Sequence, residues 1–236
     1  MSNFLLLACC LVAGLLLRKS GRVPDGAHST LNAVIIHLSL PAVTLHTLHS
    51  FSFDGSQLWP VLMPWALFGI GAITFGTIGR LLGLTRASIG ALTLVGGLGN
   101  TSFVGLPMIE SLQGRDGLGL GLLIDQLGSY LALSTVGVFA AALYAADKRT
   151  SLRVMAAKVA GFPPFIALVV ALLLRPLAIP DGVDAVLVRM GDTLAPLALL
   201  SVGLQLRFDA LSRQARLLSL GLGYKLWFAP RSWWSY

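Results

Sequence analysis

The 236-residue chain is 56% hydrophobic and only 11% charged, whereas soluble domains carry roughly 25% charged residues. This composition excludes an ordinary soluble domain and predicts an all-α polytopic membrane protein embedded in a lipid bilayer. The net charge of +7 does not indicate nucleic-acid binding, because the basic residues fall between apolar stretches rather than on one face. Cys9 and Cys10 are adjacent, which favours neither a disulfide framework nor a metal site. We expect no metal and no cofactor.

The apolar stretches give the order of the predicted membrane spans. Most are long enough for a helix that crosses roughly 30 Å of hydrocarbon, although the first and the sixth are short. An eighth stretch begins near Leu217 and runs towards the last residue, Tyr236. The first seven cover approximately residues 4–17, 31–49, 58–82, 89–112, 118–146, 159–174 and 183–206.

Basic residues predict the orientation of these spans. The loops after the odd-numbered spans are rich in Lys and Arg, and the opposite loops carry only Arg115 and Arg175. The positive-inside rule therefore places the amino terminus outside and the odd-numbered loops in the cytoplasm. We expect a multi-pass protein of a bacterial inner membrane. The basic residues of the odd-numbered loops are Arg18, Lys19, Arg22, Arg80, Arg86, Lys148, Arg149, Arg153, Lys158, Arg207, Arg213 and Arg216.

The stretch 96–107, Gly-Gly-Leu-Gly-Asn-Thr-Ser-Phe-Val-Gly-Leu-Pro, is the most informative part of the chain. It lies inside an apolar span, yet four glycines and Pro107 favour a break in the helix. Interrupted helices occur at membrane depth only where protein or a water-filled cavity covers the open backbone. They are the usual binding element of secondary transporters. The alternative is a Gly-rich packing face on an ordinary span.

Asn100, Thr101 and Ser102 lie at the predicted break, where their side chains offer donors and acceptors to polar groups of a substrate. The amino terminus of the half-helix that follows favours a carboxylate. A small organic anion is therefore the expected ligand, and it needs no buried arginine.

Asp125 and Gln126 form the second candidate site, because they lie inside the fifth span. A charge there costs roughly 2.5–3.5 kcal/mol on insertion scales. We interpret the two residues as a proton or cation site. The alternative is a shallow, hydrated Asp that pairs with Gln or Ser. Glu110, near the outer end of span four, is interpreted as a surface residue.

Further polar residues allow two interpretations. All four histidines, at positions 28, 37, 46 and 49, fall in or beside the second span, and His46 and His49 are one turn apart. They would bind a metal or relay protons, or they simply face the bundle or the interface. Asp192 in span seven lies either in a cavity or near the outer surface, and Gln205 is similar. Four glycines of span three are expected at packing positions: Gly69, Gly71, Gly76 and Gly79.

An internal repeat relates residues 31–54 to residues 186–209. Pro41 aligns with Pro196, Leu45 with Leu200, Phe53 with Phe208 and Asp54 with Asp209. The match pairs span two with span seven, and an odd shift of spans reverses orientation, so the halves would be inverted repeats. The counterpart of Asn100 would fall near position 255, beyond Tyr236. We therefore expect a shortened chain, or else a natural terminus with a Trp/Tyr anchor at the interface.

Three motifs resemble the auxin efflux carrier family, which includes bacterial malate and malonate permeases. They are Asn32 with Leu40-Pro41-Ala42, the stretch Gly99–Pro107, and Ala195–Leu204, while Lys225–Pro230 resembles the start of the family's eighth helix. The resemblance covers nearly the whole chain, and the stretch at Asn100 is its most specific part.

The resemblance implies ten helices in two inverted five-helix repeats with a broken crossover helix, related to sodium/proton antiporters and bile-acid symporters. Residues 1–146 would form the first repeat, and residues 147–236 an incomplete second. The implied function is transport of dicarboxylates or auxin-like weak acids, coupled to a proton or sodium gradient, and a homodimer is allowed. The implied substrate site adds Asn32, Pro41, Gly99 and Pro107 to Asn100, Thr101 and Ser102.

Two other classes remain open beside a carrier. An intramembrane enzyme is disfavoured, because the chain has no HExxH, no GxSxG and no paired intramembrane aspartates of the protease type. A truncated remnant of a carrier would not transport.

Overall fold

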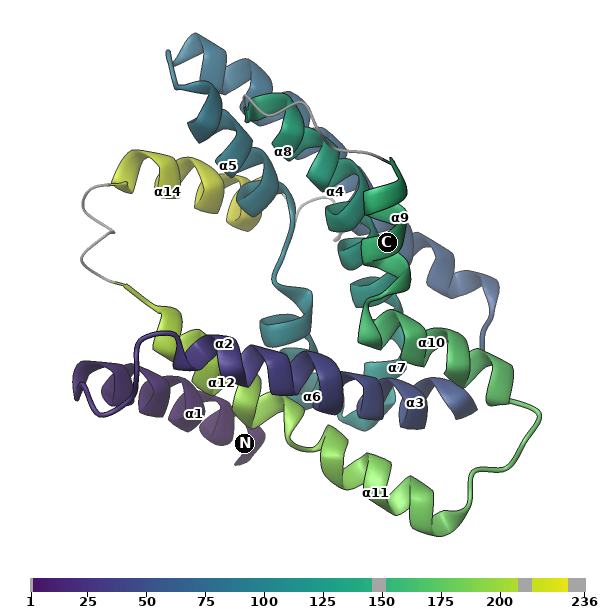
Figure 1. The fold of residues 1–236 in the computed structure, drawn as a ribbon. Coiled ribbons are helices and arrows are strands. Elements are labelled where there is room, and N and C mark those ends of the chain that lie inside the picture. Colours follow the sequence, from purple (N-terminus) through teal and green to yellow (C-terminus); the bar gives the residue numbers. More distant parts are fainter. Residues whose placement is uncertain (1, 146–151, 208–213, 229–236) are drawn as a thin grey trace. The chain divides into compact units, whose positions relative to one another are not determined.

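A computed structural model describes residues 2–145, 152–207 and 214–228, which are almost entirely helical and contain no β-strand (Figure 1). The α-helices are α1 Ser2–Lys19, α2 Ala27–Val34, α3 Leu40–Ser50, α4 Leu58–Leu81, α5 Arg86–Gly97, α6 Leu106–Gln113, α7 Leu118–Leu123, α8 Val138–Tyr144, α9 Leu152–Ala160, α10 Pro163–Leu174, α11 Asp181–Gly191, α12 Leu194–Gln205 and α14 Ala215–Gly223. Five π-helical stretches are η1 Ile35–Ser39, η3 Thr101–Gly105, η5 Ile124–Tyr130, η6 Leu133–Gly137 and η7 Tyr224–Phe228. Two short 3₁₀ turns are η2 Gly55–Gln57 and η4 Arg115–Gly117.

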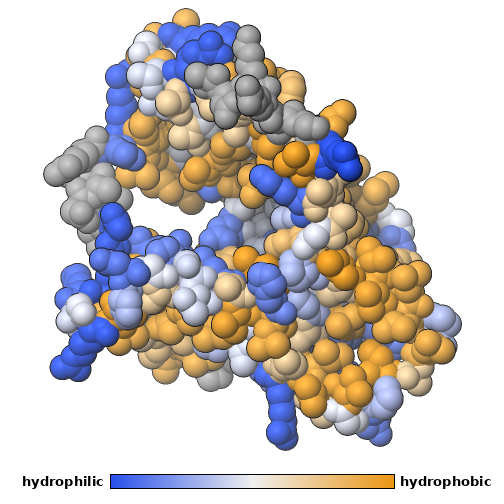
Figure 2. Space-filling model, in the orientation of Figure 1, coloured by the Kyte–Doolittle hydropathy of each residue, from blue (hydrophilic) through white to orange (hydrophobic). Residues whose placement is uncertain are grey.

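The helical segments confirm an all-α membrane protein, and the candidate spans correspond to the second, third, fourth, fifth and seventh predicted spans. Within the described residues, five segments are long and apolar enough to cross a membrane, and a sixth is added if α9 and α10 count as one span. Many large apolar side chains are exposed, among them Ile73, Leu81 and Leu173. Apolar residues cover much of the visible surface in Figure 2. Such a surface suits lipid rather than water. The five segments are Ala27–Ser50, Gly55–Leu81, Arg86–Gln113, Arg115–Tyr144 and Asp181–Gln205.

The chain divides into two compact units that interleave along the sequence. Unit 1 consists of Met1–Asp54, Asn100–Leu123 and Ala160–Leu206. Unit 2 consists of Gly55–Gly99, Ile124–Val159 and Arg207–Tyr236. The chain therefore passes between the units five times, and two of these passages lie at the predicted sites, after Gly99 and after Leu123.

Helix α12 is the centre of unit 1, where it packs against α1, α2 and η3. Helices α1 and α12 approach closely at Gly14 and Gly203, where a Cβ on either residue would collide with the backbone of the other helix. Leu7, Ala195 and Leu199 form the small apolar core at this contact. Helix α3 packs separately against α10 and α11.

Unit 2 is built on the packing of α4 against α5. A Cβ at Gly71 would lie 3.1 Å from the Cα of Gly97, and one at Gly79 would lie 2.6 Å from Cγ1 of Ile89. These two glycines are packing positions, as the sequence predicted. A Cβ at Gly76 would only touch the Tyr144 hydroxyl at 3.6 Å, and a Cβ at Gly69 would meet open space.

Several sequence-based predictions stay predictions. The boundary at residue 146 separates two sequence repeats, whereas the compact units interleave, so the units do not test the repeats. Inverted symmetry between the repeats also stays a prediction. Some positions used in those arguments lie outside the described residues: Lys148, Arg149, Phe208, Asp209, Arg213 and the tail 229–236.

Candidate functional site

The predicted helix break at Asn100 is present. Helix α5 ends at Gly97, and Leu98 is extended with φ −114° and ψ 144°. Asn100, with φ −87° and ψ 77°, is also non-helical, and helical structure resumes at Thr101. The Gly-Gly-Leu-Gly sequence explains the position of the break, since glycine weakens a helix interior. The segment is therefore not one continuous rod.

Asn100 itself starts the second half of the crossover segment. Its side-chain Oδ1 accepts a hydrogen bond from the backbone N–H of Phe103 at 3.3 Å. Its backbone oxygen accepts from the N–H groups of Val104 and Gly105, at 3.2 and 3.1 Å. Asn100 thus acts as an amino-terminal cap for η3, and the positive end of the helix dipole lies at this residue.

Pro107 has a smaller effect than the sequence predicted. It lies in the first turn of α6, where a missing N–H is tolerated, and the wide turn of η3 precedes it. The glycines before Asn100, not the proline, coincide with the loss of helical structure. Gly99 and Asn100 are exposed, Thr101 and Ser102 are half-buried, and Pro107 is buried.

Within unit 1, helix α12 contacts both η3 and α2, the helix that carries Asn32. The buried Ser201 hydroxyl on α12 donates a 2.6 Å hydrogen bond to Oδ1 of Asn32. Gln205 donates in turn to the Ser201 hydroxyl at 3.2 Å. The structure therefore gives Asn32 and Gln205 a shared partner that sequence reasoning did not identify.

Pro41 occupies the first turn of α3, directly after the π-helical turn η1. Here the buried Ser39 hydroxyl hydrogen-bonds to the Thr193 hydroxyl at 2.7 Å. Thr193 immediately precedes α12. The Pro41 region is thus joined to the same helix as Asn32, through a polar contact between side chains.

Asp125 and Gln126 lie in unit 2 on the π-helical stretch η5 and are almost completely buried, with 1% and 0% exposure. The stretch packs tightly on α4, where Trp65 donates its indole N–H to the Leu127 carbonyl at 3.0 Å. This burial disagrees with the alternative of a shallow, hydrated aspartate. π-Helical turns are rare and frequently occur at functional sites.

The histidines have separate contacts in unit 1. His46 pairs with Asp184 of α11 at 2.6 Å, while His49 donates to the carbonyl oxygens of Leu174 and Leu177 at 3.0 and 2.8 Å. His37 bonds to a carbonyl one turn earlier in its own segment. Across the described ranges, no group of three His, Cys, Asp or Glu residues is arranged to hold a metal ion.

Asp192 pairs with Arg115, which enters from the connection between spans four and five. Both side chains are about half exposed, at 48% and 53%. Glu110 is half-buried and interacts electrostatically with both. It is therefore less exposed than the surface residue that the sequence predicted. This pairing was not predicted, because the two partners are 77 residues apart.

Comparison with known proteins supplies the family. A family model described as membrane transport protein matches residues 1–219. The chain belongs to this family, which is the auxin efflux carrier family that the motifs indicated.

Two archaeal transporters are similar to this member of the family. An uncharacterized transporter of Methanothermobacter thermautotrophicus is 26% identical over 223 residues, covering 92% of this chain and 71% of the relative. An uncharacterized transporter of Methanocaldococcus jannaschii is 28% identical over 192 residues, covering 77% of this chain and 60% of the relative. The chain is a multi-pass membrane protein of a transporter family, and both relatives are longer than it is.

Proposed function

We propose that the chain is a secondary active transporter of small organic anions, coupled to a proton or sodium gradient. The observation that carries this proposal is the helix break between Gly97 and Thr101 inside an apolar span. Open backbone at membrane depth is tolerated only where protein or water covers it. In secondary transporters such a segment forms the binding element.

The substrate anion is proposed to bind at the start of η3. Asn100 caps this segment, so the positive end of its dipole and the polar side chains of Thr101 and Ser102 come together there. This combination suits a carboxylate without a neighbouring cation. Dicarboxylates and auxin-like weak acids are the proposed substrates.

Asn32, Pro41, Gly99 and Pro107 are proposed to shape this site. The contacts of α12 with both α2 and η3 support a shared role for Asn32 and the crossover segment. Gly99 lies in the non-helical backbone before Asn100, and Pro107 lies in the first turn of the helix that follows the wide turn.

Asp125 and Gln126 are proposed to bind the coupling ion. A carboxylate with 1% exposure inside an apolar span is costly. Binding a proton or a sodium ion would neutralise it, and Gln126 would add an amide oxygen as a ligand. We further propose a bacterial plasma-membrane location with the amino terminus outside, and a homodimer as the assembly.

The test is uptake of radiolabelled anions into proteoliposomes that contain this chain, under an imposed proton or sodium gradient. The panel should include dicarboxylates and aromatic monocarboxylates. We expect gradient-driven uptake of at least one anion, which the Asn100→Ala variant reduces to the level of empty liposomes. Gln113→Ala is the matched control, because this exposed amide lies at the other end of the same segment.

Two outcomes would contradict the proposal. Normal uptake by Asn100→Ala would remove this residue from the substrate site. Uptake by the longer Methanothermobacter relative, with none by this chain under the same conditions, would support the alternative of a non-transporting remnant.

A further inference from the structure

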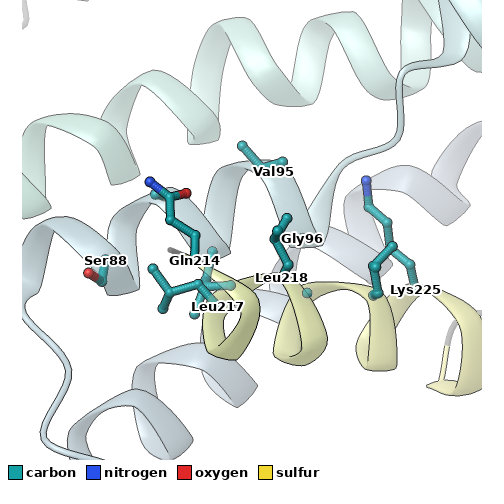
Figure 3. Close-up of a pocket in the computed structure, with 11 residues that line it drawn as sticks. Ser88, Val95, Gly96, Gln214, Leu217, Leu218 and Lys225 are labelled. Carbon is teal, nitrogen blue, oxygen red and sulfur yellow. The ribbon is translucent and has the colours of Figure 1, made fainter. Parts of the chain in front are cut away.

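A groove in unit 2 lies between α5 and the segment formed by α14 and η7 (Figure 3). Its volume is about 210 Å³, below the roughly 300 Å³ at which pockets for drug-sized ligands begin. None of its residues belongs to the proposed substrate or ion sites. The groove is lined by Ser88, Ala91, Leu92, Val95, Gly96, Gln214, Leu217, Leu218, Gly221, Leu222 and Lys225.

The two ends of the groove differ in charge. Figure 3 places Ser88 and Gln214 at one end and Lys225 at the other, with apolar side chains between them. Leu92 and Gly96 are buried in its floor, whereas Val95 and Leu222 on its rim are 72% and 52% exposed. The groove is therefore open and mostly apolar, and among its described lining residues Lys225 carries the charge while Ser88 and Gln214 are neutral.

Lys225 differs from the other residues that line the groove because it is charged. It is half-buried, follows the apolar helix α14, and makes no hydrogen bond or ion pair with any described residue of the chain. The sequence predicts an eighth span here, and a lysine inside a span is costly and marks a functional site by default, so that its partner must be sought. Because the only described acidic residue of unit 2 is Asp125, which η5 carries, an external anion is the best candidate partner.

The depth of Lys225 distinguishes a small anion from a phospholipid. Gln214 directly precedes α14, and Arg213 and Arg216 lie beside it in the sequence. At about 1.5 Å per residue, Lys225 lies roughly 16 Å further along the helix axis. A phospholipid would keep its phosphate at the Gln214 end, in the interface. A small carboxylate can instead reach the ammonium of Lys225 while its apolar body lies along the groove.

We propose that this groove binds a monocarboxylate with an apolar body, of the size of a medium-chain fatty acid. Its carboxylate pairs with Lys225, and its chain contacts Leu92, Gly96 and Leu218. A dicarboxylate of the same length binds poorly, because its second charge would lie among the apolar walls between Lys225 and Gln214. This site is separate from the proposed substrate and ion sites. Its occupation is measured as binding and not as uptake.

The test is equilibrium binding of radiolabelled octanoate to the full chain in nanodiscs of zwitterionic lipid, with empty nanodiscs to subtract partitioning. Octanoate should bind saturably. Each methylene from butanoate to octanoate should lower the Kd about fourfold. Octanedioate, which has the same length and a second carboxylate, should compete at least about tenfold more weakly, given the cost of burying an unpaired charge.

Variants locate the bound ligand. Lys225→Met, which keeps the length of the side chain without its charge, should raise the Kd for octanoate at least about tenfold. Lys225→Arg should restore binding. Gly221→Leu should also raise the Kd, because a Cβ there would lie only 3.6 Å from Leu92 and the added side chain would fill the groove. The control is Lys19→Met, an exposed lysine of unit 1.

Four results would overturn the proposal: no saturable binding, equal binding of octanedioate, binding that neither Lys225→Met nor Gly221→Leu changes, or displacement of octanoate by phosphatidylglycerol nanodiscs. The last would assign the groove to lipid. None of these results depends on uptake, so failure here is distinct from failure of the transport proposal.

Discussion

The two units accommodate polar residues in apolar spans in different ways. Unit 1 joins them across helices, as in Ser201 with Asn32, His46 with Asp184 and Arg115 with Asp192. Unit 2 instead buries Asp125 and Gln126 on a π-helical turn. A polar residue in a span is therefore not functional by that fact alone. The pairs of His46 with Asp184 and of Arg115 with Asp192 explain these unit 1 residues structurally. Asp125, with 1% exposure, is the carboxylate that we propose for ion coupling.

The largest expected effect is on gradient-driven uptake, and it is tested by substituting one aspartate in each unit. Asp125→Asn should abolish gradient-driven uptake in proteoliposomes, because the amide keeps the shape of the side chain but loses the charge that binds the ion. Asp192→Asn should keep uptake within about threefold of wild type, since exposed ion pairs contribute roughly 0–1 kcal/mol. Equal losses of uptake in both variants, with normal membrane insertion, would contradict this distinction between Asp125 and Asp192.

The next effect concerns the close helix packing of unit 1. Gly203→Ala should lower the free energy of unfolding by about 3 kcal/mol, the upper part of the range for overpacking. Its Cβ would collide with the Leu11 carbonyl oxygen and lie 3.0 Å from the Cα of Gly14. Gly69→Ala in unit 2 is the control, since its Cβ would meet open space. Reversible unfolding in mixed micelles measures both, and similar values would contradict the packing argument.

A smaller effect is expected from the hydrogen bond between α12 and α2. Ser201→Ala removes the hydroxyl that donates to Asn32, and should cost about 1–2 kcal/mol, since the hydroxyl is buried. Ser219→Ala, whose hydroxyl bonds to a carbonyl at the exposed surface, is the matched control. A double-mutant cycle with Asn32→Ala checks the pairing, and a coupling energy near zero would show that the bond contributes nothing.

The smallest expected effect is the change in unfolding free energy when the ion pair between Arg115 and Asp192 is removed. Arg115→Gln should lower the free energy of unfolding by less than about 1 kcal/mol, because both partners are about half exposed. Raising the salt concentration should shrink this difference further. A loss of several kcal/mol would instead mean that the pair is much better shielded than its exposure indicates.

The sequence was sufficient for local features of the fold. Long apolar runs predicted the helical segments, and Gly-Gly-Leu-Gly-Asn predicted the break at Asn100, because both depend on the preferences of adjacent residues. The π-helical turns at Asp125 and Ser39 were not predictable, since no recognised sequence pattern marks them. Neither were the hydrogen bond between His46 and Asp184 and the ion pair of Arg115 with Asp192, whose partners lie 138 and 77 residues apart.

The candidate site was predictable only in part. Asn100 and Asp125 stood out because polar residues in apolar spans are rare. The shared partner of Asn32 and Gln205, Ser201, looked like an ordinary small residue of span seven. Lys225 was read only as part of a family motif, because its groove exists only once α14 packs on α5.

Thiol labelling tests the central claim, that the break at Asn100 faces a wet pocket which binds an anion. Ser102→Cys would be made in a chain whose Cys9 and Cys10 are replaced by serine, and treated in proteoliposomes with a charged methanethiosulfonate reagent. We expect rapid labelling that a transported anion slows, and no labelling of Leu106→Cys, because the Leu106 side chain is 1% exposed. Ser102→Cys that stays as unreactive as Leu106→Cys, with or without anion, would contradict it.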